Sequence, residues 1–359
     1  MGIDSSLTSA FGETEALTFK EDVKWLKESI QKVKSEVGKR IVGQKEMVHL
    51  SIATVLAGGN VSLIGKPGLA KTLFVNTLAE ATGIKSDRIQ FTPDTMPSDI
   101  TGYEMLDAIE KELKFVEGPA FTDLLLADEI NRGSPRTQSA LLEAMQEKQV
   151  TVNGTPRSLG ELFHVLATQN PIEQEGTNPL PEAQLDRFLT QVDLPYPTAE
   201  EEMIIADMDD FIEVNAVISR DDLIRMERLV KKARKVFDPE VKQFAVNLVR
   251  SLRPESEEFD LQEVNDSVGF GPGPRASQAL IKMATAQALM DGRLVASIDD
   301  VKELAIPVLK HRMALDKQFV MTQDGTEDAL KIDLINKMVD HVDGLRGKKP
   351  VPSADLRMK

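Results

Sequence analysis

The first half of the chain consists of short, continuous apolar runs that alternate with longer segments of helical periodicity. A short run of consecutive apolar residues predicts a strand buried on both faces, whereas apolar residues three and four positions apart predict an amphipathic helix. Strands of that kind separated by helices are typical of an α/β fold whose parallel sheet is covered on both faces. The predicted strands are VSLI (61–64), RIQF (88–91), DLLLAD (123–128), HVLATQ (164–169) and FLTQVDLPY (188–196).

Helical periodicity dominates the beginning of the chain. Residues 1–18 carry no clear pattern, and we expect them to form a mobile arm. A helix is predicted from Phe19, and a second one follows over 44–56. The apolar positions that define the first helix are Val23, Leu26, Ile30 and Val33.

After Pro197 the strand pattern stops and only helical patterns follow. One more helix is predicted at 328–345, and the polar tail at 347–359 has the composition of a disordered segment. We therefore expect four parts: an N-terminal arm and helix (1–36), an α/β core (37–195), an all-helical domain (196–318), and a C-terminal helix with a disordered tail (319–359).

A β-hairpin is predicted inside the α/β core. The segment KQVTVNGTPRSL (148–159) alternates apolar and polar residues around Asn153-Gly154. Asn-Gly is the preferred pair for a two-residue hairpin turn, because both residues must adopt a positive φ.

Composition narrows the classes of function. The formal charge of −15 and the isoelectric point near 4.9 argue against nucleic-acid binding, which requires a basic surface. The chain has no cysteine, which excludes disulfides and thiolate chemistry. It also has no apolar run of the roughly 18 residues needed to span a bilayer, and no signal-peptide pattern at its start. We expect a cytoplasmic protein without direct membrane insertion.

The segment GKPGLAKT (65–72) follows the first predicted strand and precedes a helix. Gly65 and Gly68 allow a tight turn, the ammonium of Lys71 can bridge phosphates, and the hydroxyl of Thr72 can hold Mg²⁺. This arrangement predicts a phosphate-binding loop, although Ala70 stands where the usual pattern has a second glycine. Because Ala70 lies where the loop becomes helix, we expect it to adopt a right-handed conformation without strain.

Two acids end the third predicted strand. Asp128 can hold the hydration shell of Mg²⁺, and Glu129 beside it can act as the base for an attacking water. Two acids after a strand can also simply cap the next helix. Their position downstream of a phosphate-binding loop, on another parallel strand, favours the catalytic interpretation.

Three further polar residues are candidates for the same site. Asn170 ends a strand, where ligands bind in such sheets, but it is also a suitable turn residue before Pro171. Arg187 can stabilise charge on a terminal phosphate, or can be an ordinary helix-surface arginine. Arg275 opens a helix after a loop rich in glycine and proline, and can reach a phosphate or merely start that helix.

Read in order, these motifs resemble the MoxR family of AAA+ ATPases, from Ile41 to Leu315. The matching segments include IVGQ, GKPGLAKT, FTPDTMPSDITG, GPAFTDLLLADEINR, TQSALLEAMQE, ATQNPIEQEGT, LPEAQLDRF, PRASQAL and VLKHRMAL. In this family an alanine before the phosphate-loop lysine is usual. The resemblance implies a P-loop NTPase core with a parallel sheet, followed by an all-helical lid domain.

The resemblance also implies a role for each matching residue. Glu129 is the catalytic base, Asn170 is sensor 1, Arg187 is the arginine finger that acts on a neighbouring subunit, and Arg275 is sensor 2. Thr72 and Asp128 hold Mg²⁺. The residues that bind ATP or ADP are Val42, Gly43, Gly65, Lys66, Pro67, Gly68, Leu69, Ala70, Lys71, Thr72 and Leu73. The helix-2 insert (101–118) and the hairpin at Asn153-Gly154 face the pore of the ring.

The function implied is ATP hydrolysis in a ring homo-oligomer, a hexamer in this family, that remodels, matures or chaperones protein partners. Proteins with von Willebrand factor A (VWA) domains are the partners to expect first. Two other classes of function remain open. One is a nucleic-acid-stimulated motor with the same core, which the negative charge disfavours. The other is a scaffold that binds nucleotide without hydrolysing it, which the complete set of acids and arginines disfavours.

Overall fold

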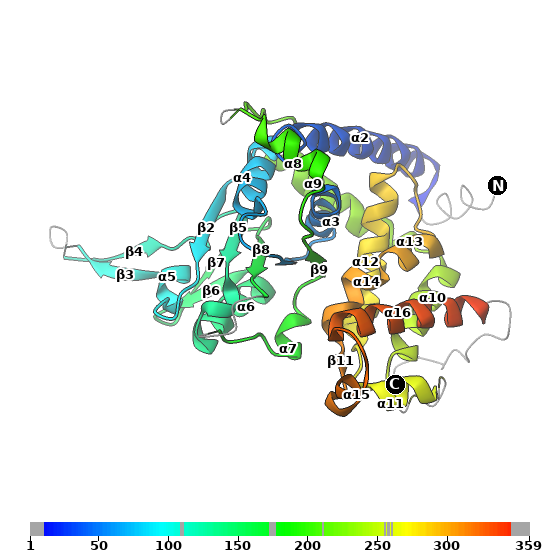
Figure 1. Cartoon of the computed structure of the whole chain (residues 1–359). Coiled ribbons are helices and arrows are strands. Elements are labelled where there is room, and N and C mark those ends of the chain that lie inside the picture. The colour runs from blue at the N-terminus through cyan, green and yellow to red at the C-terminus, as the bar shows by residue number, and fades with distance from the viewer. Residues whose placement is uncertain are drawn as a thin grey trace, which may run out of the picture. The chain divides into compact units, whose positions relative to one another are not determined.

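The computed structural model describes residues 11–107, 111–171, 177–209, 212–254, 256, 259 and 261–345 of the chain (Figure 1). The chain divides into two compact units. The first extends to Phe237 and also includes Lys282–Ala296, and the second comprises Asp238–Ile281 and the residues from Ser297 onward.

A five-stranded parallel sheet forms the centre of the first unit, in the order β2-β5-β8-β1-β9. All five strands coincide with predicted ones, so the parallel sheet expected from the apolar runs is confirmed. In a parallel sheet all carboxyl ends lie at one edge, which places the loops after β1, β5 and β8 together. The strands are β1 (Val61–Ile64), β2 (Ser86–Gln90), β5 (Leu124–Asp128), β8 (His164–Gln169) and β9 (Thr190–Asp193).

Both faces of this sheet are covered, and the alternation of side chains along β5 shows how. Leu125 and Ala127 pack into a core cluster that includes Leu141 and Met145 of helix α6 (Pro135–Glu147). Leu124 points to the opposite face, where it meets side chains of the helices there. Because neighbouring strand residues point to opposite faces, a run of three leucines supplies both cores.

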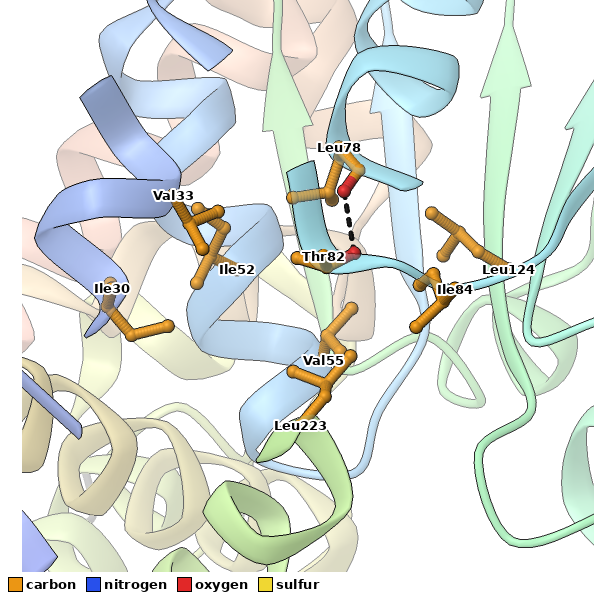
Figure 2. A pocket seen from close by; sticks show the side chains of 9 residues that line it. All are labelled: Ile30, Val33, Ile52, Val55, Leu78, Thr82, Ile84, Leu124 and Leu223. Atoms are coloured by element: carbon orange, nitrogen blue, oxygen red, sulfur yellow. Dashed lines mark hydrogen bonds between the residues drawn. The ribbon is translucent and has the colours of Figure 1, made fainter. Parts of the chain in front are cut away.

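The helices on the second face enclose a small apolar cavity of about 20 Å³ (Figure 2). The hydroxyl of Thr82 donates to the carbonyl oxygen of Leu78, so the one polar side chain at the cavity is already bonded. An apolar space of this size stays dry and is a packing gap, not a ligand site. The lining residues are Ile30, Val33, Ile52, Val55, Leu78, Thr82, Ile84, Leu124 and Leu223. They come from β5, the segment after α4, and the helices α2 (Glu13–Val37), α3 (Lys45–Leu56), α4 (Lys71–Thr82) and α9 (Arg220–Ala233).

The first long helix begins earlier than the sequence pattern predicted. Helix α2 starts at Glu13 and not at Phe19, and Ala16 is already buried. The expected arm at 1–18 is therefore wrong over its second half; residues 1–10 lie outside the described part. The reason is tertiary, since Lys232 of α9 forms an ion pair with Glu15 and its ammonium lies 4.9 Å from the centre of the Phe11 ring.

Two antiparallel hairpins belong to the first unit but not to the central sheet. Strands β3 (Gly102–Leu106) and β4 (Leu113–Glu117) form the insert at 101–118, which extends away from the sheet in Figure 1. Strands β6 (Gln149–Val152) and β7 (Thr155–Ser158) form the hairpin predicted at Asn153-Gly154, and both turn residues have positive φ. The Glu104 carboxylate joins the two hairpins, since it accepts hydrogen bonds from Asn153 at 2.9 Å and Arg157 at 3.2 Å.

The other elements of the first unit connect these parts. Helix α9 packs against α2 and α3, so the compact unit continues past residue 195, where β9 and the sheet have ended. The connecting elements are α5 (Pro97–Thr101), η1 (Ile130–Arg132), α7 (Glu182–Leu185), α8 (Ala199–Ala206) and η2 (Arg234–Val236).

The second unit is helical, as predicted, with one short antiparallel pair of strands that the periodicity did not indicate. These strands are β10 (Val268–Phe270) and β11 (Ala314–Leu315). The helices are α10 (Pro239–Ser251), α11 (Gln262–Ser267), the first part of α12 (Pro274–Met290), α13 (Ile298–Glu303), α14 (Ala305–Leu309), η3 (Lys310–Arg312), α15 (Lys317–Thr322) and α16 (Glu327–Gly344).

Helix α16 confirms the last predicted helix, and the predicted disordered tail lies outside the described residues. Among the helices that the structure describes, none is long and apolar enough to cross a bilayer.

Candidate active site

The segment 65–72 joins β1 to α4, as a phosphate-binding loop requires. Ala70 has a φ of 55° and a ψ of 21°, which is the left-handed region. Our expectation of a right-handed Ala70 was therefore wrong, because the loop needs one more reversal of the backbone before the helix starts. An L-residue with a β-carbon adopts this conformation at a cost of about 1–2 kcal/mol. Gly68 is also left-handed, with a φ of 83°.

The loop presents backbone donors and open space. Helix α4 has no side-chain cap at its N-terminus, so the N–H groups of its first turn are available to an anion. A β-carbon on Gly68 would meet no atom within 4 Å, which leaves room beside the loop. Gly65 is different, because a β-carbon there would lie 2.8 Å from the Cβ of Leu194. The first glycine is thus required for packing against the end of β9.

Lys71 is the first residue of α4, and its ammonium donates to the carbonyl oxygen of Gly65 at 2.8 Å. Partial burial lowers the pKa of Lys71, and the nearby carboxylates of Asp128 and Glu129 partly oppose that shift. The lysine and both acids therefore share one electrostatic environment, although Lys71 begins α4 and the acids lie at the end of β5.

Asp128 ends β5 and has both carboxylate oxygens engaged. Oδ1 accepts from the hydroxyl of Thr168 at 2.6 Å. Oδ2 accepts from two nitrogens of the Arg88 guanidinium, from Nη2 at 2.7 Å and from Nε at 3.2 Å. Asp128 is buried, so the guanidinium and the hydroxyl offset the loss of water around its charge.

Glu129 follows directly and has a φ of 53°, so its backbone too is left-handed. Its N–H donates to the Thr168 hydroxyl at 2.8 Å. Its Oε2 accepts from the amide of Gln90 at 2.8 Å and from Arg132 at 3.2 Å. The two acids therefore point to different partners, although they are adjacent in sequence.

Four residues at this site were not found from the sequence: Arg88, Gln90, Arg132 and Thr168. A signal for two of them exists in hindsight. Arg88 and Gln90 flank Ile89 in a predicted strand, so both project from the same face of β2, and β2 pairs with β5. Without the strand order, nothing indicated that this face meets the two acids.

Asn170 lies immediately after β8, as predicted, and is buried. Its carbonyl oxygen accepts from the side-chain amide of Asn131 at 3.4 Å. It therefore lies at the same edge of the sheet as the phosphate-binding loop, since Gly65 donates its N–H to the carbonyl oxygen of the neighbouring Gln169 at 3.2 Å.

Arg187 lies beside helix α6. It follows α7 and lines a surface groove with Gln184 and with residues of α6, which include Glu143 and Glu147. Its Nε is buried and has no hydrogen-bond acceptor among the described residues. Arg275 is the second residue of α12 and belongs to the second compact unit, so its role at a phosphate stays a prediction.

The predicted adenine segment contacts the chain just after the sheet. Gly43 has a φ of 77°, and a β-carbon on it would lie 2.6 Å from Oε2 of Glu201. The Gln44 amide donates to the carbonyl oxygen of Pro195 at 3.0 Å. Val42 beside them is half-buried. The segments at 42–44 and 195–201 thus form one wall near the loop.

The remaining predicted loop residues have different surroundings. The ammonium of Lys66 lies 4.6 Å from the centre of the Tyr196 ring, which connects the loop to that wall. Leu69 is buried, whereas Pro67 and Leu73 are exposed. Leu69 therefore anchors the loop, and the exposed residues leave its outer side open.

The site fits a nucleoside triphosphate and a divalent cation by the chemistry of its groups. Free helix-start N–H groups and a lysine suit phosphates. A hydroxyl at Thr72 and a carboxylate at Asp128 are hard oxygen ligands of the kind that Mg²⁺ prefers.

Comparisons with known proteins agree with this architecture. Residues 60–190 match the model of the "ATPase family associated with various cellular activities (AAA)", and residues 262–331 match the model of the AAA lid domain. The chain is 41% identical over 303 residues to the protein YeaC of Bacillus subtilis, covering 83% of this chain and 90% of the relative. It is 39% identical over 310 residues to Chaperone MoxR1 of Mycobacterium tuberculosis, covering 86% and 80%.

The fold is shared with a solved structure as well. A crystal structure of a protein from Cytophaga hutchinsonii superposes with a TM-score of 0.82 at 36% identity, covering 91% of this chain and 98% of that one. With a parallel sheet, a phosphate-binding loop at the carboxyl end of β1, two acids at the end of β5 and close relatives over most of its length, the chain belongs to the MoxR family of AAA+ ATPases.

Proposed function

We propose that this protein hydrolyses ATP and uses the energy, as a ring oligomer, to remodel or chaperone protein partners. The observation that carries the proposal is the arrangement at the carboxyl edge of the sheet, where Lys71 begins α4 after β1, and Asp128 and Glu129 lie at the end of β5. A cation beside two acids, at a helix N-terminus with free N–H groups, suits phosphoryl transfer to water.

In this proposal the phosphates of ATP lie on the N-terminus of α4, and Lys71 exchanges the Gly65 carbonyl oxygen for a phosphate oxygen. Thr72 and Asp128 hold Mg²⁺, which supplies positive charge to the phosphate oxygens when it is bound. Glu129 accepts a proton from water as the water oxygen attacks the terminal phosphorus. The bond from that phosphorus to the bridging oxygen breaks, and ADP and phosphate leave. Asn170 orients the water.

The position of Arg187 supports a ring. This arginine lines a surface groove beside α6 that is open to a second subunit, so we assign it to the terminal phosphate of a neighbouring subunit. Arg275 is assigned to phosphate sensing, and Val42 with Gly43 to the adenine. A hexamer is the ring typical of the family.

A protein partner is favoured by the relative Chaperone MoxR1 and by the two hairpins that Glu104 joins. Proteins with VWA domains remain the partners to test first.

The test is the variant Glu129→Gln. It keeps the size of the side chain and removes the base, so the ATPase rate should fall by about 100-fold or more, while binding of a fluorescent ATP analogue is retained. Glu161→Gln, which changes an exposed glutamate, is the matched control and should leave the rate unchanged. An ATPase rate for Glu129→Gln equal to that of the wild type would contradict the assigned mechanism.

A further inference from the structure

Strand β5 has a buried aspartate at each end, and each aspartate is paired with an arginine. Asp123 directly precedes the strand and accepts from Nε of Arg220 at 2.9 Å. Asp128 ends the strand and accepts from Arg88. The two arginine side chains are almost equally exposed, 44% for Arg220 and 46% for Arg88. Both are therefore pairs of a buried aspartate with a half-exposed arginine, and they lie at opposite ends of the same strand.

The carboxylate of Asp123 has a structural role. Its second oxygen accepts from the backbone N–H of Lys85 at 3.1 Å, and Arg220 begins α9. The pair thus connects the amino-terminal edge of the sheet to a helix. Among the residues that the structure describes, no group of three or more His, Asp or Glu side chains lies at this edge in a way that could hold a metal ion.

Asp128 lies at the other edge, beside the phosphate-binding loop, and its bonding conflicts with the role proposed for it. Its Oδ1 is occupied by Thr168, and Oδ2 accepts two N–H groups from Arg88. The hydration shell of Mg²⁺ donates hydrogen bonds and requires free carboxylate lone pairs. As long as Arg88 stays bound, Asp128 has little capacity left for that shell.

Arg88 is able to leave. It lies on β2, the outermost strand of the sheet, its side chain is about half exposed, and its guanidinium also donates to Gln90 of the same strand. The guanidinium can therefore release Asp128 at little cost, because it keeps access to water and to Gln90. Thr168 is buried and stays in place. Its bonds to Asp128 and to the Glu129 N–H keep both acids oriented while the arginine moves.

We propose that Arg88 is an internal counter-ion of Asp128 that competes with Mg²⁺ and must be displaced when Mg²⁺ and ATP bind. The pair then sets the concentration of Mg²⁺ that the protein requires for nucleotide binding. This inference rests on the proposed function, since it takes Asp128 as the residue that holds Mg²⁺.

The experiment measures binding of a fluorescent ATP analogue as a function of Mg²⁺ concentration, with wild type, Arg88→Ala and Arg220→Ala. Loss of a half-exposed ion pair should lower the half-saturating Mg²⁺ concentration by about two- to fivefold in Arg88→Ala. Arg220→Ala should behave like the wild type. Binding measured in EDTA should be equal in all three proteins, because the arginine competes only with the metal.

Arg88→Lys provides a second variant, which keeps the charge but not the two parallel hydrogen bonds. Its half-saturating Mg²⁺ concentration should lie between those of the wild type and Arg88→Ala. Thermal unfolding of each variant establishes that it is folded.

The outcomes distinguish the counter-ion role of Arg88 from the proposed ATPase function. An unchanged or higher Mg²⁺ requirement in Arg88→Ala overturns the counter-ion role while leaving the ATPase proposal intact. Weaker binding of Arg88→Ala in EDTA also overturns it, because Arg88 would then be a phosphate ligand. Failure of the wild type to bind the analogue at any Mg²⁺ concentration overturns the proposed function, and the inference with it.

Discussion

The ammonium of Lys71 donates a hydrogen bond to the carbonyl oxygen of Gly65, and this 2.8 Å contact closes the phosphate-binding loop on itself. The same ammonium is partly buried and has Asp128 and Glu129 nearby. A phosphate that enters the loop must therefore replace the carbonyl oxygen and share the lysine with two acids.

The first prediction concerns pH. Burial lowers the pKa of Lys71 from its ordinary value, so in the free protein this lysine loses its proton at a lower pH than an exposed lysine does. Affinity for ATP should therefore fall as pH rises through that lowered pKa, below the range in which other lysines titrate. Binding of a fluorescent ATP analogue between about pH 7 and pH 10 measures this effect.

The control for that prediction is Lys71→Arg, whose guanidinium stays charged throughout. Its affinity should be lower at neutral pH but nearly independent of pH. A pH profile as steep as that of the wild type would assign the titration to another group. The free energy of unfolding depends on pH with the opposite sign to the ATP affinity. The unfolded chain holds the Lys71 proton more tightly than the folded one, so this lysine makes the protein more stable as pH rises from its pKa in the folded state to its pKa in the unfolded state.

The second prediction concerns the left-handed Ala70. Glycine adopts a φ of 55° without steric cost, but it also gives the unfolded chain more freedom. The net effect of Ala70→Gly should be stabilisation of the folded state by about 0.5–1 kcal/mol, with ATP binding retained. Urea unfolding followed by the fluorescence of Trp25, the single tryptophan, measures the change.

Ala79→Gly in the same helix is the matched control. Ala79 is buried in the middle of α4, so its replacement should destabilise the protein by about 1 kcal/mol or more. Equal destabilisation by both variants would mean that the conformation of Ala70 carries no strain.

The third prediction tests whether Arg187 acts between subunits. Arg187→Ala should lose at least about 1,000-fold in ATPase rate while still binding ATP, because the arginine stabilises charge only in the transition state. Mixing Arg187→Ala with Glu129→Gln should restore part of the activity. In a mixed ring, an Arg187→Ala subunit supplies an intact Glu129, and a neighbouring Glu129→Gln subunit supplies an intact Arg187 to the same site. A mixture no more active than its components would place Arg187 outside the neighbouring site.

The fourth prediction concerns the link between the two hairpins. Glu104→Ala removes the acceptor shared by Asn153 and Arg157, so backbone hydrogen exchange should accelerate in both β3–β4 and β6–β7. The exposed pair of Arg228 and Glu161 supplies a control, since Arg228→Ala should leave both hairpins unchanged. Faster exchange in β3–β4 alone would show that the hairpins move independently.

The fifth prediction concerns the apolar cavity in Figure 2. Val55→Ile adds one methyl group to a side chain that lines the 20 Å³ space and should stabilise the protein by about 0.5–1 kcal/mol. Ile52→Val enlarges the same cavity and should cost about 0.5–1.5 kcal/mol. Urea unfolding measures both, and destabilisation by Val55→Ile would mean that the surrounding helices leave no room for the added carbon.

The strands and the phosphate-binding loop could be predicted because their signals are local. An apolar run such as 124–127 forms a buried strand wherever it lies in the chain, and glycine and lysine at fixed spacing between a strand and a helix bind phosphate by backbone geometry. The hairpin turn at Asn153-Gly154 is local in the same way.

Other features depend on contacts between distant segments. The start of α2 at Glu13 depends on Lys232, which contacts Glu15 and Phe11 and lies more than half the chain away in sequence. The left-handed conformation of Ala70 was missed because a helix start usually favours right-handed backbone, and only the closed loop requires the reversal.

The sequence by itself determined the fold class, the phosphate-binding loop, the acids Asp128 and Glu129 and the family, because these lie in contiguous motifs whose chemistry is carried by neighbouring residues. Only the tertiary structure decided which groups meet those acids. Arg88 and Asp128 are 40 positions apart, and they are paired because β2 lies next to β5 in the sheet. Strand order is set by the packing of the whole unit, and no local pattern encodes it.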